Sequence, residues 1–119
     1  GRPVKMLNVE IKARIAALAK PARDIPDQEI VERIMVGMAI ELAHALEEGI
    51  VASPQEADVA LLYGVGFPAF RGGLARWMDT VGAEALCRMA DKYVAELGPL
   101  YGVTDRQREM AKHAGTFYS

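Results

Sequence analysis

The sequence predicts an all-α protein that folds as a single helical domain of five to six helices. Apolar residues recur with helical spacing in every long segment. Capping residues and glycines separate these segments, and none of them alternates polar and apolar residues as a strand does. The length of 119 residues suits one domain.

The first predicted helix is short and follows Asn8, a favourable N-cap residue. Apolar residues then recur at helical spacing from Ile11 to Leu18, and Pro21 ends the run. We assign residues 1–23 to an inter-domain linker that contains this helix.

The helical domain itself is assigned to residues 24–119, and its longest predicted helix comes first. This helix has Pro26 as its first residue and ends at Gly49, a typical left-handed residue after a helix C-terminus. The apolar residues that mark one face are Ile30, Ile34, Met38, Leu42 and Ala45. Neighbouring apolar positions widen this stripe beyond what one small core needs, so we expect it to be buried on more than one side.

A capping box is predicted at the next helix, where Ser53 and Glu56 can each accept a hydrogen bond from the other's backbone amide. This helix runs to about Tyr63. An apolar, glycine-rich loop of residues 64–73 follows.

The remaining helices have clear limits. They span Leu74 to Val81, closing at Gly82; Ala83 to Leu97, stopped by Gly98-Pro99; and a last segment that opens at a Thr104–Gln107 capping box and ends at Gly115.

Composition excludes several classes of function. The formal charge of −2 and pI of about 5.7 argue against a nucleic-acid or anionic-membrane module. The single cysteine, Cys87, excludes an internal disulfide. No membrane span or signal peptide is evident, and Gly1 replaces an initiator Met, so we expect a fragment of a soluble cytoplasmic protein.

The loop sequence from Gly64 to Ala69 matches the dinucleotide fingerprint G-x-G-x-x-G/A. That fingerprint requires a strand before the loop and a helix that starts inside it. Here a helix is predicted before the loop, and Pro68 removes a backbone amide. We therefore expect a tight apolar connector in which Phe67 and Phe70 fold back onto the core.

Other candidate reactive residues have little support. Glu41-x-x-His44 resembles half of a di-metal site, but no second copy of the motif is present, so a solvated helix face is expected. Ser53 is committed to capping. Cys87 lies on the apolar side of its helix, where burial raises the pKa of a thiol and lowers its reactivity.

An ordered series of short segments is more distinctive than any of these motifs. The segments are Glu29 to Met35, Ala45 to Pro54, Glu56-Ala57-Asp58, Tyr63 to Gly73, Arg76 to Gly82, Leu97 to Tyr101 and Gly115 to Tyr118. Together they resemble the C-terminal domain of 3-hydroxyacyl-CoA dehydrogenases. The resemblance is greatest to the second, most C-terminal copy of this domain in the alpha subunit of the bacterial fatty acid oxidation complex.

The resemblance implies an all-α fold like the C-terminal domain of 6-phosphogluconate dehydrogenase. It also implies a parent enzyme of fatty acid β-oxidation, an NAD-dependent 3-hydroxyacyl-CoA dehydrogenase that carries an enoyl-CoA hydratase domain. The implied partners are the Rossmann domain and first helical copy of the same parent chain, and a thiolase beta subunit. NAD would bind to the Rossmann domain, so no cofactor is expected in this fragment.

No catalytic, cofactor-binding or metal-binding residue is carried over to this chain. The family's substrate-contacting copy has an Asn-Arg pair where this sequence has Glu32-Arg33, and a Gly-Pro pair where it has Gly72-Gly73. Both departures indicate the second copy, which packs against the first. The fragment would then serve domain packing and assembly and would not be catalytic alone.

Two alternatives remain. In the first, the chain is a substrate-contacting copy in which Glu32 or Arg33 lines an acyl-CoA pocket and Arg33 and Arg71 pair with CoA phosphates. In the second, the chain is an unrelated helical interaction module. Under the packing hypothesis, the long helix from Pro26 to Glu48 and the Phe67–Phe70 loop supply the contact surface, and the excised chain can self-associate.

Overall fold

A computed structural model describes residues 8–19 and 23–118, and these residues are all-helical, as predicted. They form α1 (Val9–Leu18), α2 (Asp27–Glu47), α3 (Pro54–Gly64), α4 (Leu74–Val81), α5 (Ala83–Leu97) and α6 (Asp105–Lys112). Two short 3-10 helices, η1 (Ala69–Arg71) and η2 (Pro99–Tyr101), were not expected from the sequence.

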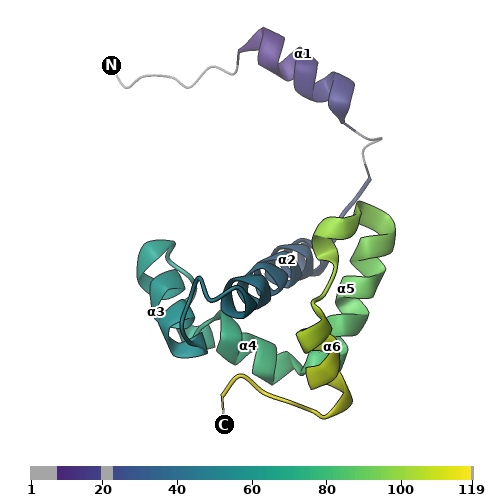
Figure 1. Ribbon diagram of the computed structural model, residues 1–119. Helices are drawn as coiled ribbons and strands as arrows, with labels where there is room; N and C mark the ends of the chain where they lie inside the picture. The colour runs from purple at the N-terminus through teal and green to yellow at the C-terminus, as the bar shows by residue number, and fades with distance from the viewer. Residues whose placement is uncertain (1–7, 20–22, 119) are drawn as a thin grey trace.

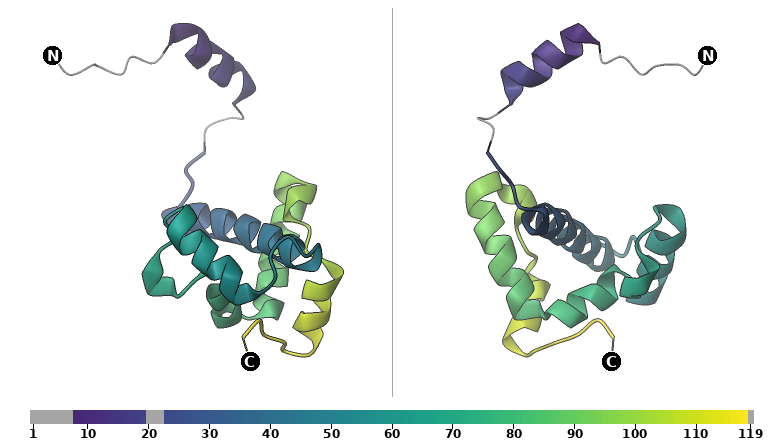
Figure 2. Two further views of the ribbon diagram at one scale, coloured as in Figure 1. Left: turned by 60° about the vertical axis from the view of Figure 1, so that its left-hand side comes forward. Right: turned by 180° about the vertical axis from the view of Figure 1, so that it is seen from behind.

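The helices from α2 onward form one body with α2 at its centre (Figure 1). α3 lies at one end of this body, the α5–α6 pair lies at the other, and α4 runs between them. α4 contacts α2, α3 and α5, while α6 packs mainly on α5. Seen from behind, the same arrangement leaves α1 clear of the body (Figure 2).

The core lies where α2, α4 and α5 meet, but the side of α2 that it uses differs from the prediction. The α2 residues that are buried are Met35, Val36, Ala39, Ile40, Leu42 and Ala43. Ile30 and Ile34, which head the predicted buried face, are exposed. The packed partners from α4 and α5 include Leu74, Met78 and Tyr93. One face of α2 is therefore in the core, and its opposite face carries uncovered apolar side chains.

The boundaries of α2 match the prediction closely. Pro26 is the residue before the helix rather than its first residue, and its carbonyl accepts hydrogen bonds from the amides of Glu29 and Ile30. At the other end Gly49 has a φ of +69°, as expected. The amide of Ile50 returns to the carbonyl of Ala45 at 2.9 Å, which completes a Schellman C-cap.

The two predicted capping boxes have different outcomes. The box at α6 is complete, because Thr104 and Gln107 each accept from the other's amide, at 3.1 and 3.0 Å. At α3 the Ser53 hydroxyl does accept from the amide of Glu56, but the Glu56 carboxylate bonds the amide of Ala52 and not that of Ser53. The return bond is thus displaced by one residue, and it still satisfies an amide beside the helix N-terminus.

The last helix is shorter than predicted. α6 ends at Lys112, and the left-handed residue after it is Ala114, with a φ of +50°, rather than Gly115. The amide of Gly115 then bonds the carbonyl of Met110 at 2.8 Å. A Cβ on Gly115 would lie 3.3 Å from Met110, so the tight turn itself favours glycine here.

α1 falls within the predicted linker of residues 1–23. Asn8 caps it through a 2.9 Å bond from the amide of Glu10, as expected, and the helix ends at Leu18. None of its residues is buried. The predicted stop at Pro21 lies outside the described residues, so the linker assignment remains a prediction.

Candidate functional site

The glycine-rich connector has none of the geometry of a dinucleotide loop. The residues before it belong to α3, and the residues after Pro68 form only η1, a single 3-10 turn. Gly66 and Gly72 have φ values of +73° and +75°, which allow the chain to reverse twice in a short distance. A site for pyrophosphate needs the free amides of a long helix at this point. The connector therefore lacks the helix that the dinucleotide fingerprint requires inside its motif.

The two phenylalanines of this connector differ in burial. Phe67 is buried in the core, as predicted. Phe70 is 85% exposed, so the expectation that it folds back onto the core is wrong. η1 turns its side chain outward, where the guanidinium of Arg71 lies 5.4 Å from the ring centre.

A buried carboxylate, Asp58 of α3, holds the far side of the connector. Its Oδ1 accepts the amide of Ala75 at 2.8 Å and its Oδ2 accepts the amide of Arg76 at 3.3 Å. These are among the first amides of α4, which have no partner within the helix. Asp58 thus caps α4 from another helix. Gly73 is required at the contact, because a Cβ there would lie 2.1 Å from the Asp58 carboxyl carbon.

The C-terminal segment is fastened to the same place. Tyr118 donates its hydroxyl hydrogen bond to Asp58 Oδ2 at 2.8 Å, and the guanidinium of Arg76 lies 3.8 Å from the centre of its ring. Asp79 accepts the amides of Phe117 and Tyr118 at 2.8 and 2.9 Å. Burial, followed by the hydrogen bond to Asp58, raises the pKa of Tyr118 to about 12. Hydrogen bonds to Asp58 and Asp79 therefore join α3, α4 and residues 117–118 to one another.

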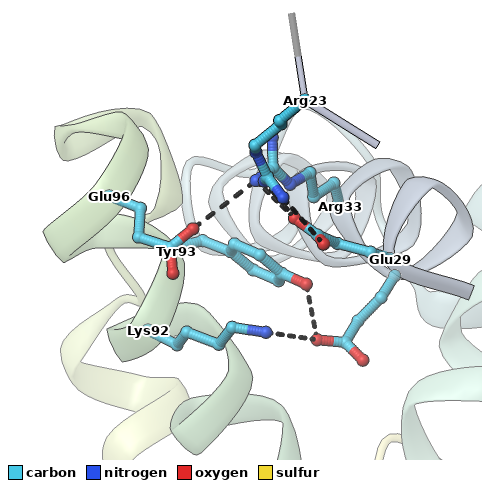
Figure 3. A network of polar contacts seen from close by, with 7 residues as sticks. Arg23, Glu29, Arg33, Lys92, Tyr93 and Glu96 are labelled. Atoms are coloured by element: carbon cyan, nitrogen blue, oxygen red, sulfur yellow. Dashed lines mark hydrogen bonds and ion pairs between the residues drawn. The ribbon is translucent and has the colours of Figure 1, made fainter. Parts of the chain in front are cut away.

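Glu32 and Arg33, the candidates for an acyl-CoA contact, lie in a polar network between α2 and α5. Figure 3 shows Arg33 beside Glu29 and Glu96. The hydroxyl of Tyr93 donates to Glu32 Oε1 at 2.6 Å. Arg33 lies 2.5 Å from Glu29 and 3.5 Å from Glu96. Burial, and then the bond to Glu32, raises the pKa of Tyr93 to about 12. Both candidates thus join α2 to α5.

The network extends to the segment that precedes α2. Arg23 lies 2.5 Å from Glu29, which also receives Arg33 (Figure 3). The hydrogen bond from Arg23 is the main reason that the pKa of Glu29 is lowered. One carboxylate therefore holds two guanidinium groups at the N-terminal end of α2, where helix geometry also favours negative charge.

The remaining reactive candidates lie apart from one another. Glu41 and His44 are exposed on α2, as expected for a solvated face. Within residues 8–19 and 23–118, no three His, Cys, Asp or Glu side chains are grouped as metal ligands. Cys87 is buried with its Sγ 3.8 Å from the carbonyl of Gln107, and burial raises its thiol pKa, as the sequence predicts. Ser53 is used in capping.

The surface that stands out is apolar. Tyr63, Val65 and Phe70 are strongly exposed around the turn from α3 to η1, and we call these three residues the apolar tip. An open groove of about 380 Å³ lies between α2 and α3. Its lining is almost wholly apolar and consists of Met38, Glu41, Leu42, Ala45, Val51, Ala57, Ala60, Leu61 and Leu74. Groups of exposed apolar side chains of this kind are typical of a protein–protein contact.

Comparison with protein families identifies this arrangement. Residues 30–115 match the family model for the C-terminal domain of 3-hydroxyacyl-CoA dehydrogenase. The chain belongs to this family. The match begins inside α2 and continues past α6, so the whole helical body apart from the start of α2 is family sequence, and α1 lies outside it. The family assignment and the all-α fold are thus both as predicted, and the chain is linked to the oxidoreductases of fatty acid metabolism.

The matched residues include the apolar tip and the cap of α4. The segment Tyr63 to Gly73 contains the apolar tip, and the segment Glu56-Ala57-Asp58 contains the α4 cap. The capping role of Asp58 and the anchoring role of Asp79 were missed from the sequence. The adjacent Gly72-Gly73 pair was a signal that a side chain approaches the backbone closely there, but not of which side chain.

None of the helices in the described residues combines the length and hydropathy that a membrane crossing needs.

Proposed function

We propose that this chain is a packing module of a multifunctional fatty acid β-oxidation enzyme, in which it presses against a sister helical domain. The observation that carries the proposal is the apolar tip, above all Phe70, which projects into solvent from the connector between α3 and α4. A side chain of this size is costly to leave in water, at about 1.5–3 kcal/mol. The groove between α2 and α3 is a second open apolar surface of the domain.

The side chains at the family's substrate-contacting position support a structural role. Glu32 is the acceptor for a buried tyrosine, and Arg33 is paired with two carboxylates. Binding a CoA phosphate through Arg33 would require breaking these pairs and placing the phosphate beside Glu29 and Glu96. Arg71 is exposed and stays the better of the two arginines for the alternative of an acyl-CoA contact.

The partners follow from this assignment. The sister domain is the first helical copy of the same parent chain, and the chemistry takes place on that copy together with a Rossmann domain that binds NAD. An enoyl-CoA hydratase domain and a thiolase beta subunit complete the complex in the cytoplasm. Residues 24–119 contribute no group to hydride transfer. Without the sister domain, two copies of this chain are expected to associate weakly through the same surface.

The contact is tested by measuring binding between this chain and the separately produced upstream part of its parent. Phe70→Asp places a charge at the centre of the apolar tip and should weaken binding at least about 30-fold, which corresponds to about 2 kcal/mol. Leu100→Asp is the matched control, because Leu100 is also an exposed apolar residue, at 65%, but belongs to η2 on α5. It should change binding by less than about threefold. Equal losses for the two variants would contradict the proposed surface.

A second measurement separates packing from substrate binding. Calorimetric titration of the 119-residue chain with NAD and acetoacetyl-CoA should give no heat of binding for NAD and at most weak binding for the thioester. Tight thioester binding that Arg71→Ala abolishes would favour the substrate-contacting alternative. An upstream reading frame that lacks both a Rossmann unit and a helical copy with an Asn-Arg pair would contradict the proposed multifunctional parent.

A further inference from the structure

α1 is a helix without a partner in the structure. It has ten residues, none of which is buried. Isolated helices shorter than about 12–15 residues are marginal in water, because nucleation is costly and few hydrogen bonds follow. A stable α1 therefore needs a surface on which to pack.

The apolar side of α1 is narrow and has basic edges. Ile11, Ile15 and Leu18 fall on one face at helical spacing, and all three are exposed. At 100° per residue, Lys12 and Arg14 fall on either side of this face. α1 thus presents a short apolar stripe with Lys12 on one flank and Arg14 on the other, where Glu10 falls about 40° beyond Arg14.

A matching surface lies on the N-terminal half of α2. Ile30 and Ile34 are exposed on the side away from the core, and the partly buried Met38 continues their line. Ile30 and Met38 are eight positions apart, or about 12 Å along the helix axis, while α1 is about 15 Å long. The exposed acidic residue Glu41 lies near the C-terminal end of this α2 stripe, toward which an antiparallel α1 would turn its half that contains Lys12 and Arg14.

The connection between the two helices is short. Arg23 is held against α2 by its ion pair with Glu29. Leu18 precedes Arg23 by five residues, which reach at most about 17 Å. This distance lets α1 turn back antiparallel to α2, with Leu18 near Ile30. A tether this short also gives α1 an effective concentration in the millimolar range at its own α2, far above that of α1 from another molecule.

We infer that α1, which lies clear of the body in Figures 1 and 2, moves onto the α2 of its own chain, with its stripe of Ile11, Ile15 and Leu18 covering Ile30, Ile34 and Met38. The occupant of this half of α2 is therefore the chain's own first helix. The sister domain proposed above contacts the other apolar region, the tip and the groove. The two surfaces meet at Met38 and Glu41, and the inference does not depend on the family assignment.

The test is hydrogen exchange of the α1 amides in the 119-residue chain, measured by mass spectrometry or NMR. Docking should slow exchange over residues 9–18 at least about tenfold relative to unstructured peptide. Ile34→Asp should remove this protection while the amides of α5 remain protected, which shows that the body is still folded. Val59→Asp, at a residue of similar exposure on α3 (54% against 57%), should leave α1 protected.

Three results would overturn the inference. The first is exchange of α1 at the unstructured rate in the unaltered chain, and the second is protection that Ile34→Asp does not reduce. The third is protection that rises with protein concentration across the range in which sedimentation detects a dimer, because this would assign α1 to a second copy. All three leave the Phe70 binding experiment unaffected, so the two proposals fail separately.

Discussion

Replacing Asp58 by Ala tests the most important buried polar contact of the domain. The carboxylate is 3% exposed and accepts three hydrogen bonds, two from amides of α4 and one from the hydroxyl of Tyr118. With Ala in its place the amide of Ala75, which is fully buried, has no acceptor. The start of α4 also loses the negative charge that faces its dipole. We expect a cooperative domain that is clearly less stable.

The size of the effect follows from these contacts. A buried amide left without a partner costs about 1–3 kcal/mol, and a carboxylate at a helix N-terminus contributes about 0.3–1 kcal/mol and up to about 2 kcal/mol when partly buried. The Tyr118 hydroxyl, at the half-buried chain end, adds about 0.5–1 kcal/mol. The sum is about 3 kcal/mol, a large part of the 5–15 kcal/mol that is typical of a folded domain.

Two gentler variants separate the contributions. Asp58→Asn retains an acceptor for the amide of Ala75 but loses the charge, so it should cost about 1–2 kcal/mol. Tyr118→Phe removes only the hydroxyl and should cost about 1 kcal/mol. Because both variants act on the same oxygen, the double variant should cost less than the sum of the two.

The assay is urea unfolding followed by circular dichroism, with the free energy of unfolding obtained by linear extrapolation. Glu56→Ala is the control, because Glu56 also accepts a backbone amide near a helix start but is exposed, and it should cost less than about 1 kcal/mol. An Asp58→Ala variant no less stable than Glu56→Ala would refute the reasoning. So would strict additivity of Asp58→Asn with Tyr118→Phe.

Two further predictions concern the same packing. Gly73→Ala should destabilise the domain by at least about 3 kcal/mol in the same urea assay, because its Cβ would overlap the Asp58 carboxyl group. The control is Gly98→Ala, because Gly98 has a similar φ (+104° against +129°) but a Cβ there would have no atom within 4 Å. This control should cost only about 1–2 kcal/mol. Equal losses would show that backbone conformation alone explains the effect. The pKa of Tyr93 and that of Tyr118 are both raised from 10 to about 12, so the folded state holds these protons more tightly than the unfolded state. Their contribution to the free energy of unfolding is complete below pH 10 and is lost as the pH rises toward 12. The urea concentration at the unfolding midpoint should therefore decrease between pH 10 and pH 12, and a constant midpoint would contradict the prediction. Tyr93→Phe should flatten this alkaline decline, whereas Tyr63→Phe, at an exposed phenol, should leave it unchanged.

The α-helices could be predicted because the signals that define them are local. The limits of α4 and α5 are those read from the sequence, and Asn8, Gly49 and Thr104 act in the structure as predicted. The errors at helix ends are also local in scale. At α3 the Glu56 carboxylate accepts the amide of Ala52, one residue before the predicted Ser53. The last helix, α6, ends at Lys112 and not at the predicted Gly115.

The candidate site was predicted less well, because it depends on which side of each element is buried. The apolar stripe of α2 was recognised as too broad for one core, yet its more obvious half, Ile30 and Ile34, is the half that is exposed. Phe67 and Phe70 are three residues apart in the same loop, and only the turn at η1 decides that one is buried and the other is not. Composition and spacing are the same for both outcomes.

The sequence alone determined the helices, most of their ends and the family to which the chain belongs, since each of these is written in neighbouring residues or in their order. Only the tertiary structure decided that Asp58 caps a helix that begins 16 residues later and binds Tyr118 another 44 residues beyond that helix start. It also decided that Glu32 and Arg33 are bound to α5 and that Phe70 remains in solvent. The physical reason is that a side chain's hydrogen-bond partner and its burial depend on which distant segments pack against it. The local sequence pattern does not specify those segments.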